Sequence, residues 1–337
     1  MANREGPIAG FMLEFSSGPI FEVKGLIHPP GKAVAYPRYI PDPRGPRKKG
    51  HRAFRKLTSW SERLVLLEGP FKGYMVFDPI LGDRFCEVSL REVQVLDPRE
   101  GLERLRKSNE PFELARLALE MADELRDRAN LAWRDLGVSG SLLVGLAGPS
   151  SDIDIMAYGL KACLEAYSAL RSMRQEGITK PLGLRELMTI YDARSRDTPY
   201  DLRTFLAREP RKLLQGVFRN RPYSIRLVPR KDREPYGTLR FKPLGTAVIR
   251  AEVADASKSM LTPCSYSLAH VQVLEGPRGV KPSALVSFRL RFCEQATEGE
   301  LVEARGKLEA VFDPEGFLEV RIVVGGQPGD YFRPLRP

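Results

Sequence analysis

The fold of the central third of the chain is decided by Ser139-Gly140-Ser141 and by Ser151-Asp152-Ile153-Asp154-Ile155, which begins ten positions after Ser141. Alternate side chains of a strand point to opposite faces, so Asp152 and Asp154 share one face while the isoleucines point into a core. Two carboxylates on one face are suitable ligands for a hard cation such as Mg²⁺ or Mn²⁺. The pattern therefore predicts a metal site at Asp152 and Asp154.

The Gly140-Ser141 pair is suited to binding phosphate. Glycine allows close approach of the backbone, and the Ser141 hydroxyl and N–H can donate hydrogen bonds to phosphate oxygens. A helix starting after Ser141 would add the positive field of its N-terminus. Nucleotidyl transfer needs cations on the triphosphate and donors that hold it in line for attack, and the two stretches together predict both.

Regular elements are expected on both sides of these stretches. Asn109 can cap a helix that runs to about Leu136, and Gly137 ends its pattern. Further along the chain, hydrophobic periodicity predicts a strand at 152–157, a helix at 160–176, basic helical segments within 181–220 and a strand at 223–228. Together they define a central α+β domain at residues 101–235.

In this context, Gly140-Ser141 and Ser151-Asp152-Ile153-Asp154 resemble the Gly-Ser … Ser-Asp-x-Asp hallmark of the DNA-polymerase-β-like nucleotidyltransferase superfamily, over about residues 110–228. The resemblance implies that Asp152 and Asp154 are catalytic and bind Mg²⁺ or Mn²⁺. It also implies that Gly140, Ser141 and Ser151 bind an NTP substrate. The whole chain further resembles an archaeal group of predicted nucleotidyltransferases that carry extra domains on both sides.

One feature departs from that family, whose transferring members usually place a third carboxylate on a later strand. The strand expected at 223–228 has Arg226 in its middle. An arginine can contact phosphate, and Arg226 is therefore a candidate nucleotide-binding residue, but it can neither bind Mg²⁺ nor accept a proton. Asp192 and Asp232 are alternative third carboxylates. Without one, nucleotide binding is better supported than transfer.

The flanking regions read as β structure. Residues 1–100 contain strand-like runs between Pro- and Gly-rich turns, with a basic loop at 44–52. Residues 240–337 contain five strand-like runs that suggest a small, OB-like barrel, and one of them, 284–292, alternates polar and apolar side chains from Ser287 to Phe292. The predicted fold class is therefore α+β. A central nucleotidyltransferase-type mixed sheet with helices (101–235) is flanked by an N-terminal β-rich basic module (1–100) and a C-terminal five-stranded β-barrel-like domain (240–337).

The net charge of +10 is concentrated on two stretches that flank the signature, +4 over residues 1–100 and +9 over residues 181–250. Such asymmetry indicates a polyanionic partner, and beside a triphosphate site RNA is the expected acceptor. Solvated loops and helix faces with ion pairs are the alternative interpretation of both stretches. Aromatic side chains interleaved with residues 32–56 could stack on bases or belong to a core.

Other classes of protein and site are not supported. The four cysteines have no CxxC spacing, which disfavours a zinc site or a disulfide framework. No apolar run is long enough for a membrane span and no signal peptide is recognisable, so we expect a cytoplasmic protein without a membrane partner. Few Asn and Gln beside many charged residues suggest a thermophile, although the arginine bias could equally reflect genome composition.

The leading hypothesis is a Mg²⁺-dependent nucleotidyltransferase that moves a nucleoside monophosphate from an NTP to an acceptor, most readily RNA. The alternative is a catalytically degenerate nucleic-acid-binding protein that uses the same fold as a scaffold. A third class, modification of a protein or a small molecule, stays open because the sequence does not identify an acceptor pocket.

Overall fold

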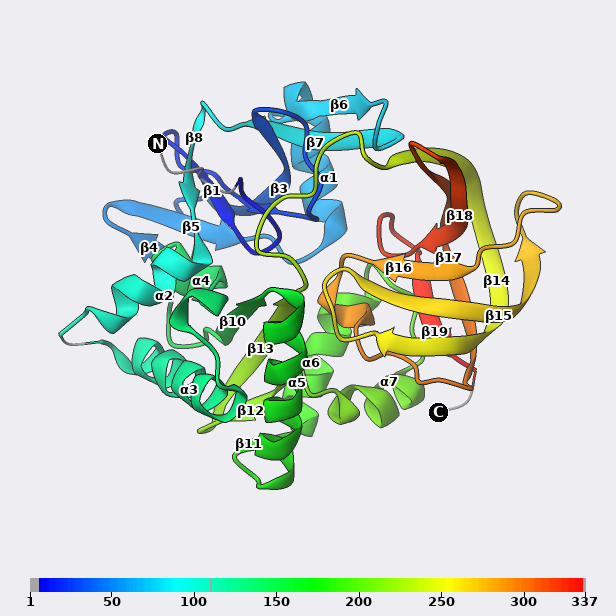
Figure 1. The fold of residues 1–337 in the computed structure, drawn as a ribbon. Helices are drawn as coiled ribbons and strands as arrows, with labels where there is room; N and C mark the ends of the chain where they lie inside the picture. Colours follow the sequence, from blue (N-terminus) through cyan, green and yellow to red (C-terminus); the bar gives the residue numbers. More distant parts are fainter. Residues whose placement is uncertain (1–5, 110, 336–337) are drawn as a thin grey trace. The chain divides into compact units, whose positions relative to one another are not determined.

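The computed structural model describes residues 6–109 and 111–335. The fold is α+β, as predicted, and contains several separate sheets (Figure 1). The chain forms two compact units, and each collects separated segments. The first unit takes residues 6–58, 87–182 and 213–233, and the second takes 59–86, 183–212 and 234–335. That the consecutive segments 1–100, 101–235 and 240–337 form three domains stays a prediction.

The N-terminal part of the first unit is a β-sheet with the strand order β4-β5-β3-β2-β1-β8. Its strands are β1 (Met12–Phe15), β2 (Ile20–Val23), β3 (Lys32–Pro41), β4 (Arg47–Lys49), β5 (Arg52–Lys56) and β8 (Val93–Leu96). The end of β7 (Asp83–Ser89) also pairs with β3. The predicted basic loop at 44–52 is wrong in part, because β4 and β5 pair as an antiparallel hairpin around Gly50 and His51.

The central part of the first unit is a second sheet with the order β11-β12-β13-β10-β9, in which β10 and β13 run parallel. Its strands are β9 (Leu136–Val138), β10 (Ile153–Tyr158), β11 (Thr179–Lys180), β12 (Gln215–Phe218) and β13 (Arg221–Val228). The helices of this part are α2 (Pro98–Arg106), α3 (Glu113–Ala129), α4 (Gly140–Leu143) and α5 (Leu160–Gln175). Helices α3 and α5 pack on each other and on β10 (Figure 1).

The predictions for β10, α5 and β13 are confirmed to within one residue at each end except at the start of β13. The helix expected to start at Asn109 begins only at Glu113, with Phe112 at its N-cap. It ends at Ala129, well before Gly137, because Asn130 adopts a left-handed conformation with φ 48°. Asparagine tolerates this conformation, so it ends the helix as glycine often does.

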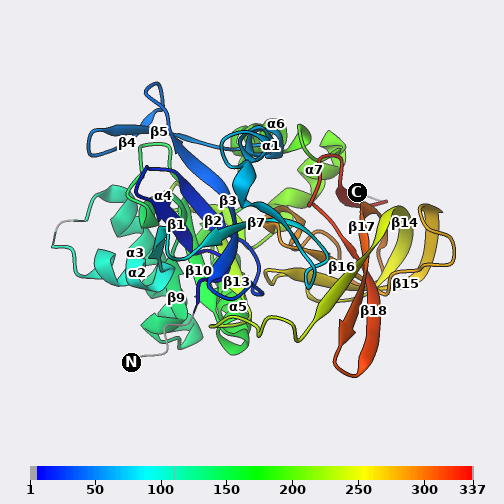
Figure 2. The ribbon, with the colours of Figure 1, turned by 90° about the horizontal axis from the view of Figure 1, so that it is seen from above.

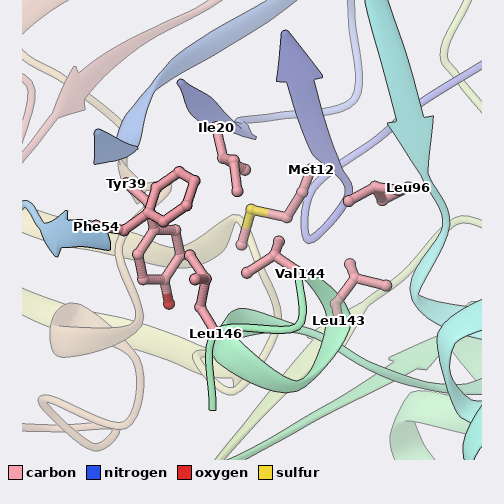
Figure 3. Packing of buried hydrophobic residues seen from close by; sticks show 8 residues of the cluster. All are labelled: Met12, Ile20, Tyr39, Phe54, Leu96, Leu143, Val144 and Leu146. Carbon is pink, nitrogen blue, oxygen red and sulfur yellow. The ribbon is translucent and has the colours of Figure 1, made fainter. Parts of the chain in front are cut away.

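A buried cluster joins the N-terminal sheet to α4 and the residues directly after it (Figure 3). The N-terminal sheet contributes Met12, Ile20, Tyr39, Phe54 and Leu96, the end of α4 contributes Leu143, and the following residues contribute Val144 and Leu146. Burial of such side chains stabilises the fold by about 1.5–3 kcal/mol each. The cluster therefore fixes the turn after Gly140-Ser141 against β3 and β5, although the two regions are about a hundred residues apart in sequence.

The second unit contains a larger sheet, with the order β14-β15-β16-β18-β17-β19 and an additional pairing of β14 with β17, which curls it into a half-barrel. Its strands are β14 (Arg240–Lys258), β15 (Cys264–Glu275), β16 (Ala284–Ser287), β17 (Leu301–Asp313), β18 (Gly316–Val323) and β19 (Tyr331–Pro334). The remaining elements of this unit are α1 (Trp60–Glu68), β6 (Met75–Asp78), which pairs with the start of β7, α6 (Leu184–Ser195) and α7 (Leu202–Arg208).

Two sequence predictions for this region need correction. The strand expected at 284–292 ends at Ser287, and a 3₁₀ turn follows at Leu290–Phe292 in spite of the alternating pattern. Phe292 is buried within this turn, so its apolar position fits the alternation although no strand continues to it. The helical region predicted at 181–220 ends in strand β12. Among the described residues, no helix is sufficiently long and apolar to cross a membrane.

Candidate nucleotide and metal site

Asp152 and Asp154 lie at the start of β10, and the predicted alternation holds. Ile153 and Ile155 are buried in the core, whereas the Asp152 side chain is 40% exposed. Asp154 is opposite Ser224 of the parallel strand β13, and the Ser224 hydroxyl donates a hydrogen bond of 2.6 Å to Asp154 Oδ1. The two carboxylates therefore face the same side of the sheet, and one of them is held in place by a neighbouring strand.

Gly140 lies directly against the second carboxylate. A Cβ atom at this position would come within 1.9 Å of Asp154 Oδ2, and the backbone has φ +58°. The Ser139 N–H also donates to the Asp154 carbonyl at 2.9 Å. Only glycine leaves room for the carboxylate in this conformation, so the Gly-Ser turn and the aspartate pair form one structural unit.

Ser141 is buried, and its hydroxyl has no hydrogen-bond partner among the described residues. An unpaired buried hydroxyl is costly and indicates a missing partner. The helix expected after Ser141 is present as α4, which begins already at Gly140 and is only four residues long, so its N-terminal field is weak. Any contribution to phosphate binding comes from the turn itself.

The loop at 145–151, which joins α4 to β10, is held by arginines on two sides. Arg47 of β4 donates to the Leu146 carbonyl at 2.7 Å and to Ser151 Oγ at 2.9 Å, and Arg221 of β13 donates to the Pro149 carbonyl. Ser151 is buried and also accepts a hydrogen bond from the Gly148 N–H. In this arrangement Ser151 organises the loop, and its contact with a nucleotide stays a prediction.

Cations from the N-terminal sheet surround the aspartate pair. Lys56, at the end of β5, places Nζ 4.0 Å from Asp152 Oδ1, and Arg38 of β3 donates to the Leu57 carbonyl next to it. Burial, followed by the charge of Asp152, raises the pKa of Asp154 to about 6, and Lys56 and Ser224 oppose this rise. The raised pKa therefore reflects mainly the burial of Asp154, which the nearby cations and the Ser224 hydroxyl offset only in part.

Arg226, predicted to bind nucleotide, lies on β13 two residues after Ser224, and its guanidinium donates to Glu22 Oε1 at 2.6 Å. Glu22 is buried and also pairs with Lys24 at 2.7 Å and with Arg38 at 3.8 Å. Although burial alone would raise it, these three cations hold the pKa of Glu22 well below its usual range. Arg226 is therefore anchored to a carboxylate of β2, and a phosphate contact by Arg226 stays a prediction.

No third carboxylate joins the pair within the part of the chain that the structure describes. No cluster of three metal-ligating acidic, histidine or cysteine side chains is found there. Asp192 is exposed on α6 of the second unit, and Asp232 is exposed in the segment after β13. Ser224 and Arg226 occupy the face of β13 beside Asp154, where the family resemblance implies an acid.

The donor set could nevertheless hold one divalent ion. Mg²⁺ usually keeps several waters and binds through one or two carboxylates together with substrate phosphates. Around the three carboxylates of Asp152, Asp154 and Glu22, Lys56 pairs with Asp152, and Lys24, Arg38 and Arg226 pair with Glu22, so four positive charges face three negative ones. Addition of a divalent cation would increase the positive surplus, and a polyphosphate is a ligand that can balance it.

Sequence reasoning missed four residues of this constellation, namely Glu22, Arg38, Lys56 and Ser224. Lys56 and Arg38 lie in the stretch that the sequence identified as basic, but its charge was interpreted as a contact for nucleic acid. The alternation Tyr223-Ser224-Ile225-Arg226 could have shown that Ser224 faces the same side as Arg226. Nothing in the sequence indicated that β2 supplies Glu22.

Comparison with known proteins gives one informative result. The chain is 29% identical over 333 residues to the uncharacterized protein MJ1086 of Methanocaldococcus jannaschii, which covers 93% of this chain and 94% of that protein. The similarity therefore extends across both compact units. No family model matches the chain, and no solved structure matches it.

Proposed function

We propose that this protein is a Mg²⁺-dependent nucleotidyltransferase that transfers a nucleoside monophosphate from an NTP to an acceptor, with RNA as the expected acceptor. The observation that carries the proposal is the contact between Gly140 and the carboxylate of Asp154. It unites the two halves of the sequence signature in one turn, with Asp152 on the same face of β10. A Gly-Ser turn and an Asp-x-Asp strand that merely co-occurred in the sequence would have no reason to touch.

Each group has a chemical role in this proposal. Asp152 and Asp154 would hold a magnesium ion, which neutralises charge on the triphosphate and favours attack at the α-phosphorus. Gly140 and Ser141 would donate backbone and hydroxyl hydrogen bonds to phosphate oxygens.

The choice of RNA as acceptor rests on the β4–β5 hairpin, which belongs to the same compact unit as the aspartates. Arg44, Lys48, His51 and Arg52 of this hairpin region are exposed, and Arg47 connects it to the loop that precedes Asp152. Figure 2 shows β4 and β5 extending from the N-terminal sheet. Exposed cations next to a nucleotide site are suited to the phosphate backbone of an acceptor strand.

The direct test is incubation of the protein with each α-³²P-labelled NTP, Mg²⁺ or Mn²⁺, and total RNA. We expect label in RNA with at least one NTP, and a loss of about a hundredfold or more in Asp152→Asn and Asp154→Asn, because each removes a metal ligand. Asp127→Asn, which changes an exposed carboxylate on α3 that belongs to neither the aspartate pair nor the candidate third carboxylates, is the matched control and should keep full activity. Transfer that is absent with every NTP, or unchanged in both site variants, would refute the proposal.

The residues of β13 beside Asp154 favour a second candidate function. Because Ser224 and Arg226 replace the acid expected there, a nucleic-acid-binding protein that has lost transfer is the alternative. This alternative predicts that RNA binding depends steeply on salt and that the affinity for RNA is unchanged when Asp154 is replaced. It also predicts no saturable binding of Mn²⁺–nucleotide, whereas the proposed enzyme must bind it.

A further inference from the structure

Lys56 is the cation closest to the aspartate pair. It is the last residue of β5, it lies opposite Tyr39 in the β3–β5 register, and its side chain is 23% exposed. At 4.0 Å its Nζ forms an ion pair with Asp152 Oδ1, beyond hydrogen-bonding distance. The ammonium group is therefore attracted to the carboxylates without being locked to them.

The other cations near the pair are already engaged. Arg47 holds the Leu146 carbonyl and Ser151, and Arg38 pairs with Glu22 and donates to the Leu57 carbonyl. Arg226 pairs with Glu22 at 2.6 Å. Lys56 differs from them in carrying a compact charge on a flexible four-carbon stem, which can change its contact without disturbing a fixed network.

The location of Lys56 also follows from packing. Phe54, two residues before it, is buried in the cluster that joins β3 and β5 to the segment after α4 (Figure 3). Alternation along β5 then places Phe54 and Lys56 on the same face, the face directed to the Gly140-Ser141 turn. The backbone beneath Lys56 is thus fixed while its side chain reaches Asp152.

We propose that Lys56 binds the nucleotide phosphates in the loaded site and occupies the cation position beside Asp152 when no nucleotide is bound. This inference rests on the proposed function and adds a substrate-binding residue from the N-terminal sheet. An ammonium group and a metal ion compete for the same carboxylate, because like charges repel at this distance. A phosphate group between them removes the conflict, so metal and nucleotide bind together more readily than metal alone.

The test compares two affinities in the full-length protein. Mn²⁺ binding without nucleotide is measured by electron paramagnetic resonance, and binding of Mn²⁺ with an α,β-methylene nucleoside triphosphate of each base is measured by calorimetry. In Lys56→Met, which keeps the stem and removes the charge, we expect Mn²⁺ alone to bind about threefold to tenfold tighter and the Mn²⁺–nucleotide complex to bind about tenfold weaker. Lys56→Arg should retain most of the nucleotide affinity.

The expected changes in the two affinities are opposite in direction, which separates this role from a structural one, because a misfolded site would weaken both affinities. Lys161→Met changes an exposed lysine on α5 of the same unit and should change neither affinity. If Lys56→Met shifts both affinities in one direction, or leaves both as in Lys161→Met, the inference is overturned while the proposed function stands. If the wild-type protein binds no Mn²⁺–nucleotide complex, the proposed function fails and the phosphate role of Lys56 fails with it.

Discussion

Gly140 and Asp154 are in such close contact that no other residue can replace the glycine without displacing the carboxylate. The Cβ of any L-residue at 140 would meet Asp154 Oδ2 at 1.9 Å, in a backbone conformation with φ +58° that disfavours side chains. The contact couples the turn after β9 to the start of β10. A change at either residue must therefore affect the other.

The first prediction is that Gly140→Ala disrupts the aspartate pair. The strained backbone and the clash should lower the free energy of unfolding by about 1–3 kcal/mol. The displaced Asp154 should also weaken Mn²⁺ binding. Urea denaturation and titration with Mn²⁺ measure the two effects. Gly148→Ala is the matched control in the following loop, because a Cβ there meets nothing within 4 Å, and it should alter neither quantity. Equal effects of the two variants would contradict the assignment.

The second prediction concerns the loop that precedes Asp152. Arg47→Ala removes the hydrogen bonds to the Leu146 carbonyl and to Ser151. We expect faster amide hydrogen exchange over residues 145–151 and a coupling energy of about 1 kcal/mol or more between Arg47 and Ser151 in a double-mutant cycle. Arg44→Ala removes an exposed arginine nearby and is the control. Additive effects of Arg47→Ala and Ser151→Ala would show that the hydrogen bond does not hold the loop.

The central sheet could be predicted from sequence because its signals are local. Alternation of Asp and Ile gave β10, helical periodicity gave α5, and the apolar strand gave β13. The cationic surroundings of the aspartates could not be predicted in the same way. Lys56 and Glu22 reach the site through ion pairs with Asp152 and Arg226, residues far from them in sequence, and no local pattern encodes such contacts.

The helix ends and the C-terminal strands illustrate a second limit. Helix α3 has Phe112 at its N-cap, where the sequence predicted Asn109, and it ends at Asn130. Several polar residues near each end could cap a helix, and the residue that does so depends on where the helix packs. The residues at 287–292 alternate as in a strand, but 290–292 form a 3₁₀ turn in which Phe292 is buried. Periodicity detects buried faces and does not distinguish these local conformations.

The third prediction concerns the pH dependence of stability. His28 is buried in the first unit, and its Nδ1 accepts a hydrogen bond from the Val34 N–H at 3.1 Å. Burial, together with the charge of Arg233, lowers the pKa of His28 to about 3. The unfolded chain, with a pKa of about 6.5, then binds more protons than the folded chain between these values. Stability from this group is therefore complete above about pH 6.5 and is lost as the pH falls.

The expected loss from His28 is about 2 kcal/mol between pH 7 and pH 5. His28→Asn keeps a hydrogen-bond acceptor near the Val34 N–H but does not titrate, so its free energy of unfolding should vary less over this range. Urea denaturation at several pH values measures the difference. His51→Asn, at the exposed turn of the β4–β5 hairpin, should leave the pH profile of the wild-type protein unchanged. A profile for His28→Asn that parallels the wild type would contradict the prediction.

The fourth prediction concerns the carboxylate that β13 lacks beside Asp154. Ser224 is opposite Asp154 in the parallel register and donates to its carboxylate at 2.6 Å. Ser224→Asp would place a third carboxylate beside Asp152 and Asp154. Like charges at this distance repel, so the melting temperature without divalent ions should fall, by an amount equivalent to about 1–2 kcal/mol. With Mn²⁺ the loss should be recovered, because the added oxygen ligand and the added charge both favour the metal.

Ser224→Asn is the matched control, since it is close in size to the aspartate but carries no charge. Its amide can still donate to Asp154, but it should not gain the Mn²⁺-dependent stabilisation. We expect Ser224→Asp to bind Mn²⁺ about tenfold tighter than Ser224→Asn. If the wild-type protein is an enzyme limited by the missing acid, transfer should also rise in Ser224→Asp and in no other variant at this position. The same Mn²⁺ response in both variants would show that the face of β13 beside Asp154 does not contribute to the metal site.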